Sequence, residues 1–111
     1  MRHHVLRLLP GQDLMKELES YLLAHHIKSA WIVTCVGSLT KTTLRYANKP
    51  GPVTKSGHFE IVSLVGVLTP KPYVSHVHMS LSDGKGHTFG GHVLEEGNTV
   101  YTTAEIVIAE A

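Results

Sequence analysis

The chain has 111 residues, enough for one modest hydrophobic core and too few for two, so residues 1–111 are expected to form a single domain. Hydrophobic residues make up 42% and charged residues 17%, a balance typical of globular proteins that excludes intrinsic disorder. Ten Lys and Arg against nine Asp and Glu leave a net charge of +1 without any basic run, so charge does not support non-specific binding to nucleic acid.

The N-terminal part of the sequence predicts a strand followed by a helix. His3–Leu9 alternates enough to form a strand, and Pro10-Gly11 ends it. Asp13 then supplies the carboxylate that favours the start of a helix. From Leu14 to His26 the apolar side chains recur at steps of three and four residues, which predicts one buried helical face.

The rest of the chain predicts strands. Short runs of β-branched and aromatic residues alternate with turns rich in glycine and proline, including Gly37-Ser38, Asn48–Gly57 and Asp83–Gly86. The runs are Ala30–Val36, Thr42–Ala47, Phe59–Leu68, Val74–Ser82, Thr88–Leu94 and Thr99–Ile108. One helix followed by closely connected strands predicts an α+β fold, in which the helix covers one face of a mainly antiparallel sheet.

Cys35 is the only cysteine and lies within the apolar run Ala30–Val36, so we expect a buried thiol that acts as a small hydrophobic group. The N-terminal residues lack the apolar core of a signal peptide, and no apolar stretch reaches the roughly 18 residues of a membrane span. A cytoplasmic protein without membrane contact is the expectation.

Two of the nine histidines, His76 and His78, have the spacing of metal ligands. Residues i and i+2 of a strand point to the same face, roughly 7 Å apart along the chain. Two imidazoles at this separation can share one cation, and a third ligand from a neighbouring strand would complete the set. The other histidines show no comparable spacing, and among them only His92 is a candidate for the third ligand.

His92 is the candidate third ligand, and its orientation depends on the register of one hairpin. A three-residue loop, pairing Ser82 with Gly86 or Asp83 with His87, places all three histidines on one face. A two-residue turn would place His92 on the opposite face.

Gly90-Gly91 precedes His92 and adds a further alternative, because a bulge there could restore the alignment. Spacing alone therefore leaves two interpretations open. The histidines either form a metal site or belong to a polar sheet face on which they form hydrogen bonds with neighbouring residues.

Three protein ligands would leave one coordination position for water or substrate, as in catalytic zinc sites. A metal ion there could lower the pKa of bound water or polarise a carbonyl group. Glu60, Glu105 and Arg45 lie on predicted strands and are candidate catalytic helpers, with surface or ion-pair roles as the alternative. The sequence contains no nucleophile elbow and no phosphate-binding glycine loop.

Six segments of the chain resemble the plants-and-prokaryotes conserved (PPC) domain, a family found as free-standing proteins in prokaryotes and joined to AT-hook segments in plants. They span nearly the whole chain in the order of the family. The segments are Arg7–Leu14, Val36–Leu39, Leu44–Ala47, Gly57–Leu64, His76–Ser82 and Gly90–Leu94.

The resemblance implies a strongly curved antiparallel sheet with one principal helix, assembled as a homotrimer. In free-standing members the His-x-His and Gly-Gly-His segments are associated with a bound metal, which implies zinc on His76, His78 and His92. The sequence departs from the plant proteins because it has no Arg-Gly-Arg core of an AT-hook, so minor-groove binding by that element is not implied.

The implied fold is also similar to that of acetolactate decarboxylase, whose zinc is held by a comparable histidine set. Two functional hypotheses follow. The first is a trimeric metal-binding module that senses a small ligand or makes regulatory contacts with DNA or protein. The alternative is a metal-dependent lyase or hydrolase acting on a small carbonyl or carboxylate compound, while a purely structural trimer without metal remains the third interpretation.

Overall fold

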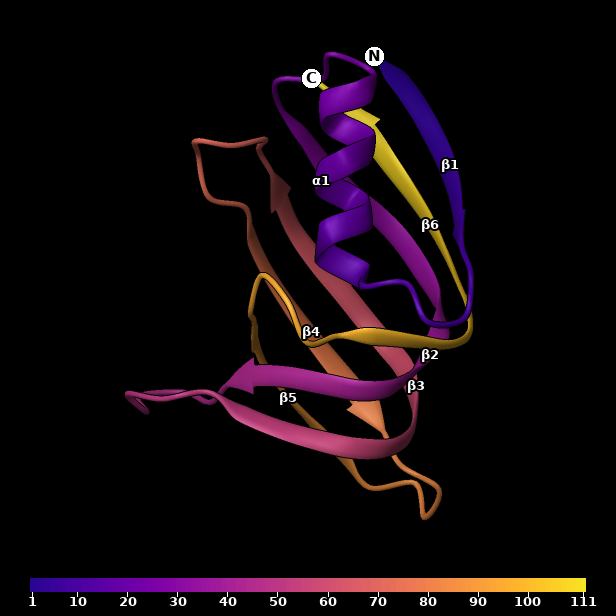
Figure 1. Ribbon diagram of the computed structural model, residues 1–111, viewed down its shortest axis with the longest axis vertical. Coiled ribbons are helices and arrows are strands. Elements are labelled where there is room, and N and C mark those ends of the chain that lie inside the picture. Colours follow the sequence, from indigo (N-terminus) through magenta and orange to yellow (C-terminus); the bar gives the residue numbers. More distant parts are fainter.

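A computed structural model describes residues 1–111 and contains one helix and six strands (Figure 1). Their order is β1 (Arg2–Leu8), α1 (Leu14–Ala24), β2 (Ala30–Arg45), β3 (Val53–Leu68), β4 (His76–Ser82), β5 (Thr88–Val93) and β6 (Thr99–Glu110). Every strand pairing is antiparallel, so the predicted α+β class is confirmed.

The strands form one sheet in the order β1-β6-β2-β3-β4-β5, and β5 also pairs with the end of β2. In this second pairing Leu44 is opposite Val93 and Arg45 is opposite His92. The sheet therefore curls until strands β2 to β5 close on themselves in its lower half, where β2 and β3 bend sharply (Figure 1). The strong curvature expected from the resemblance is confirmed.

Strand β2 is longer than the sequence predicted, because Gly37-Ser38 does not end it. A Cβ atom on Gly37 would clash with the carbonyl oxygen of Thr103 on β6, so the glycine permits close packing of the two strands. The register of β2 against β6 shifts near this residue. The expected loop Asn48–Gly57 was likewise too long, since β3 already begins at Val53.

The helix α1 covers the upper half of the sheet, next to β1, β6 and β2 (Figure 1). Asp13 is its N-cap and accepts a hydrogen bond from the Lys16 amide, as the sequence predicted. The buried side chains Leu14, Leu18 and Leu22 face the core. The helix ends at Ala24, two residues earlier than expected, and no helix in the structure is long and apolar enough to cross a membrane.

The opposite side of the sheet carries an unusual number of exposed apolar side chains. We call this surface the outer face and define it by Val5, Trp31, Val33, Val36, Val62, Val65 and Val67 of β1, β2 and β3. Their neighbours along each strand, such as Ile32, Ile61 and Leu68, are buried in the core. Alternation along the strands thus gives the sheet two apolar faces, of which the helix and the curled strands cover only one.

Cys35 is only partly buried, although it packs against the core. Partial burial of the side chain raises the pKa of the thiol to about 12, and the negative charge of Glu105 contributes to this increase. The expectation that this thiol acts as a small hydrophobic group agrees with these surroundings, whereas the expected full burial was wrong.

Candidate metal centre

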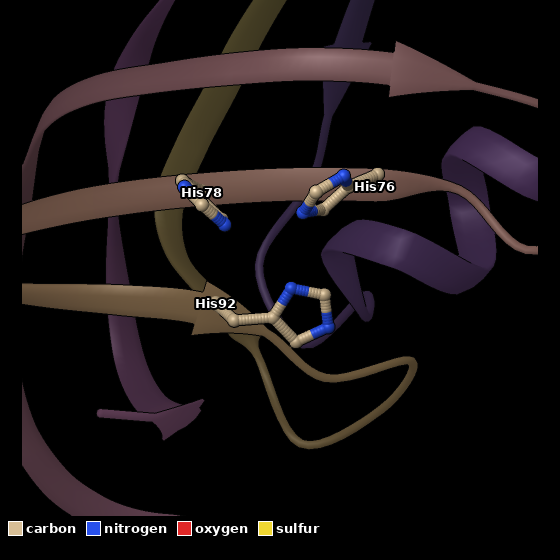
Figure 2. A group of neighbouring side chains, drawn as sticks. All are labelled: His76, His78 and His92. Atoms are coloured by element: carbon tan, nitrogen blue, oxygen red, sulfur yellow. The ribbon is translucent and has the colours of Figure 1, made fainter. Parts of the chain in front are cut away.

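His76, His78 and His92 converge on one face of the sheet (Figure 2). His76 and His78 alternate with the buried Val77 on β4, so both point away from the core. His92 on β5 is the direct cross-strand partner of His78. One ligating atom from each imidazole lies within 4.8 Å of the other two, and the ring centroids are 4.9 to 5.8 Å apart.

The turn between β4 and β5 sets this alignment. The Asp83 amide donates to the His87 carbonyl at 3.0 Å, and the Gly86 amide donates to the Asp83 carbonyl at 3.0 Å. Asp83 Oδ1 also accepts from the amides of Lys85 and His87, each at 2.9 Å. Of the two alternatives with a three-residue loop, the structure therefore has the one that pairs Asp83 with His87.

Gly90 and Gly91 bring β5 close to both of its neighbours, and no bulge interrupts the register there. A Cβ atom on Gly90 would lie 2.5 Å from the Met79 carbonyl oxygen of β4. A Cβ atom on Gly91 would lie 2.6 Å from the Arg45 carbonyl oxygen of β2. Because only glycine fits at these two positions, β5 can lie between β4 and the end of β2 and present His92 beside His78.

The surroundings of His92 favour its neutral form. Burial lowers the pKa of His92, and the positive charge of Arg45 lowers it further, with smaller effects from His76 and His78. A neutral imidazole is the form that binds a metal. None of the three imidazoles takes part in the side-chain hydrogen bonds or ion pairs of the structure, so the alternative of a hydrogen-bonded polar face is not supported.

Of the three catalytic candidates, only Arg45 lies beside the histidines, directly opposite His92. Glu60 and Glu105 line a separate cavity of about 920 Å³ that contains none of the three histidines. Glu105 also accepts a hydrogen bond from Thr103 Oγ1 at 2.8 Å and lies 4.0 Å from the Arg7 Nε atom. The two glutamates are therefore not placed to act at the histidine cluster.

A cavity of about 610 Å³ adjoins His92, and the sequence did not predict it. Its walls come from α1, from residues 71–75 and from residues 92–96. Two ion pairs join these walls, Lys16 with Glu96 at 3.0 Å and Lys71 with Glu19 at 3.5 Å. No spacing motif could have revealed the cavity, because four separate segments form it, the fourth being Thr43 of β2.

The model of the Plants and Prokaryotes Conserved (PCC) domain, here called PPC, matches residues 1–111. Over the same 111 residues the chain is 41% identical to the bifunctional protein GlmU of Synechococcus sp. (strain JA-3-3Ab), of which it spans only 17% of the length. It is also 29% identical over 99 residues to AT-hook motif nuclear-localized protein 25 of Arabidopsis thaliana, covering 84% of this chain and 33% of that protein.

Solved structures share the fold. A hypothetical protein of Salmonella cholerae-suis is 41% identical, with a TM-score of 0.93 over 98% of this chain and 77% of that one. A metal-containing protein of Archaeoglobus fulgidus is 26% identical, with a TM-score of 0.81 over 100% of this chain and 81% of that one. The curled sheet and its single helix are thus an architecture shared with known proteins.

Proposed function

The chain belongs to the Plants and Prokaryotes Conserved domain family, and from this premise we propose that it is a metal-binding module in which His76, His78 and His92 hold one zinc ion. The observation that carries the proposal is the convergence of three imidazoles whose ligating atoms lie within 4.8 Å of one another. Zinc bound to histidine lies about 2.0–2.1 Å from each nitrogen, so small rotations of the rings would let one ion contact all three.

The donor set favours zinc over the harder cations. Neutral imidazoles suit zinc and other late transition metals, whereas calcium and magnesium prefer oxygen ligands. The cluster contains three imidazoles and no carboxylate, so a bound zinc ion would keep one position for an exogenous ligand. The metal-containing relative from Archaeoglobus fulgidus supports a metal in this fold.

We also propose that the module assembles as a homotrimer through its outer face. Val36, Val62 and Val67 are each more than half exposed there, and exposed apolar surface of this kind marks an interaction site. The metal centre borders the outer face, because Val65 is paired with His78 and Val67 with His76 across β3 and β4. Assembly of three copies would remove these valines from water.

Within the proposal, the metal module senses a small ligand or makes regulatory contacts with DNA or protein. Ligand sensing has the stronger support, because a cavity adjoins His92. DNA contact is the weaker part, since the chain carries a net charge of only +1. Association with duplex DNA that weakens steeply with added salt would support DNA contact, and no binding at low salt would overturn it.

The alternative proposal, a metal-dependent lyase or hydrolase, needs a proton carrier at the metal. Arg45 is present beside His92, but arginine keeps its proton and can only stabilise negative charge. Glu60 and Glu105 lie in the other cavity. Binding of a ligand at the metal is therefore favoured over its chemical conversion.

The test is the metal content of protein purified without an affinity tag and without added metal, measured by inductively coupled plasma mass spectrometry. We expect close to one zinc ion per chain in the wild type and a loss of at least tenfold in a variant carrying His76→Ala, His78→Ala and His92→Ala. The matched control carries His3→Ala and His87→Ala, two exposed histidines outside the cluster, and should keep its zinc. A wild type without metal, or a triple variant with undiminished metal, would contradict the proposal.

A further inference from the structure

The cavity beside the metal centre has the size and lining of a small-molecule site. Its volume of about 610 Å³ lies within the usual range for such sites. Met15 and Leu18 of α1, Val93 at the end of β5 and Leu94 supply apolar wall. A ligand with an apolar part would lose contact with water on binding between these walls.

His92 connects this cavity to the metal centre. It is the one histidine of the cluster that also lines the cavity. A ligand atom that completes the coordination of the metal would therefore lie at one end of the cavity, and the rest of the ligand could extend along its apolar wall. This juxtaposition defines the shape of the ligand, with a polar end at the metal and an apolar tail away from it.

The charges next to the metal favour an anionic polar end. Three neutral imidazoles leave the full double charge of a zinc ion uncompensated, because no carboxylate belongs to the cluster. Arg45 lies on the same face as His92, its direct cross-strand partner, and forms no ion pair within the chain. By contrast, Lys16 and Lys71 of the cavity wall are already paired with glutamates.

We propose that this site binds a small carboxylate anion with an apolar tail, a conclusion that rests on the proposed metal-binding function. With a metal ion held by the three histidines, the carboxylate would take the coordination position that they leave open, and it would pair with the guanidinium of Arg45. The tail extends into the cavity between α1 and Leu94. Planar, two-pronged recognition of carboxylate is the usual role of arginine in such sites.

The experiment uses the protein loaded with cobalt(II), whose visible absorption reports both metal binding and any change in its ligands. Acetate, butyrate and hexanoate are titrated into the loaded protein, and the affinity of each is read from the cobalt spectrum. Each buried methylene contributes about 0.8 kcal/mol, so the affinity should rise about fourfold per methylene from acetate to hexanoate. Inorganic phosphate should bind more weakly than hexanoate, because it has no tail.

Variants separate the two parts of the site. Arg45→Met should weaken all three carboxylates by a common factor of about ten, measured at pH 8 with cobalt in excess so that the metal site stays filled in every variant. The matched control Arg2→Met on β1 should bind like the wild type. Leu94→Trp should fill the cavity, so that hexanoate binds no better than acetate. If Leu94→Trp does not fold, Val74→Trp at an exposed position of the cavity wall takes its place.

The outcomes distinguish this inference from the proposed function. Cobalt bound by the three histidines with a spectrum that no carboxylate alters would overturn the inference and leave the metal-binding function standing. An affinity independent of tail length, or unchanged in Arg45→Met, would do the same. A protein that binds no cobalt would overturn the metal-binding function and the inference together.

Discussion

His78 on β4 and His92 on β5 are direct cross-strand partners, and their imidazoles leave the sheet on the same face. This pairing depends on two features, the turn that precedes β5 and the two glycines in the middle of that strand. The three-residue loop after Asp83 sets the register, and Gly90-Gly91 lets β5 lie between its two neighbours.

Replacing Gly91 with alanine should destabilise the protein and weaken its hold on the metal. The new methyl group would lie 2.6 Å from the Arg45 carbonyl oxygen, and moving β5 away to relieve this clash should cost about 1–3 kcal/mol. Urea unfolding and metal content measure the two effects. Gly84→Ala is the matched control, because nothing lies within 4 Å of its added methyl group, and equal stability of the two variants would contradict the close-approach argument.

Metal retention should depend steeply on pH. Bound imidazoles must be neutral, and a free histidine gains its proton near pH 6.5, so protons displace the metal as the pH falls below this value. Because burial and Arg45 lower the pKa of His92, this ligand resists protonation to a lower pH than a free histidine does. Competition with a zinc chelator from pH 8 to pH 5 measures the effect, and a zinc affinity independent of pH would argue against imidazole ligands.

Asn98→Ala should lower the free energy of unfolding, because Asn98 is fully buried and its side chain links its own segment to β2 and to Leu94. Its Oδ1 atom accepts from Thr42 Oγ1 at 2.8 Å and from the Thr43 amide at 3.0 Å, and its Nδ2 donates to the Leu94 carbonyl at 3.2 Å. Leaving these groups unpaired should cost about 2–4 kcal/mol in the free energy of unfolding. Asn48→Gly at an exposed turn should change it by only a few tenths of a kcal/mol, since glycine accepts the positive φ of that residue.

Val62→Glu should dissociate the proposed trimer without unfolding the subunit. Val62 is 57% exposed in the single chain, so glutamate fits there in a monomer but would be buried without a partner in an assembly. Light scattering coupled to gel filtration measures the mass. The control Val74→Glu, at a residue 69% exposed outside the outer face, should remain trimeric, and a trimeric Val62→Glu protein would place the interface elsewhere.

Cys35 should react slowly with iodoacetamide. Burial raises the pKa of its thiol from 9.0 to about 12, which lowers the thiolate fraction at pH 8 roughly a thousandfold. Glu105→Gln should increase the rate, because the Glu105 charge adds to the shift. The comparison is the same thiol in urea, and equal rates in the folded and unfolded protein would contradict the protected environment.

Local sequence patterns predicted the elements of the fold well. Asp13 marked the start of α1, and the alternation around Val77 marked both the strand and the two histidines on its exposed face. Glycine positions were harder to interpret. Gly37 suggested a turn and Gly90-Gly91 a bulge, yet all three allow the backbone of a neighbouring strand to approach, and that neighbour is distant in sequence.

The positions of the three candidate catalytic residues likewise depended on strand contacts that the local sequence does not show. Arg45, Glu60 and Glu105 were equivalent as residues on predicted strands, and only the curling of the sheet brings Arg45 to His92 and leaves both glutamates at another cavity. The cavity beside His92 likewise needs α1, Thr43 of β2, the segment before β4 and the residues at and after the end of β5 to meet.

The sequence by itself therefore determined the α+β class, the helix start and the shared face of His76 and His78, since these depend on residues a few positions apart along the chain. The tertiary structure decided that His92 lies on the same face as His76 and His78, that the sheet closes, and that Arg45 lies beside His92. These depend on the register and curvature of strands that meet across long separations, and a shift of one residue in that register would turn His92 to the other face.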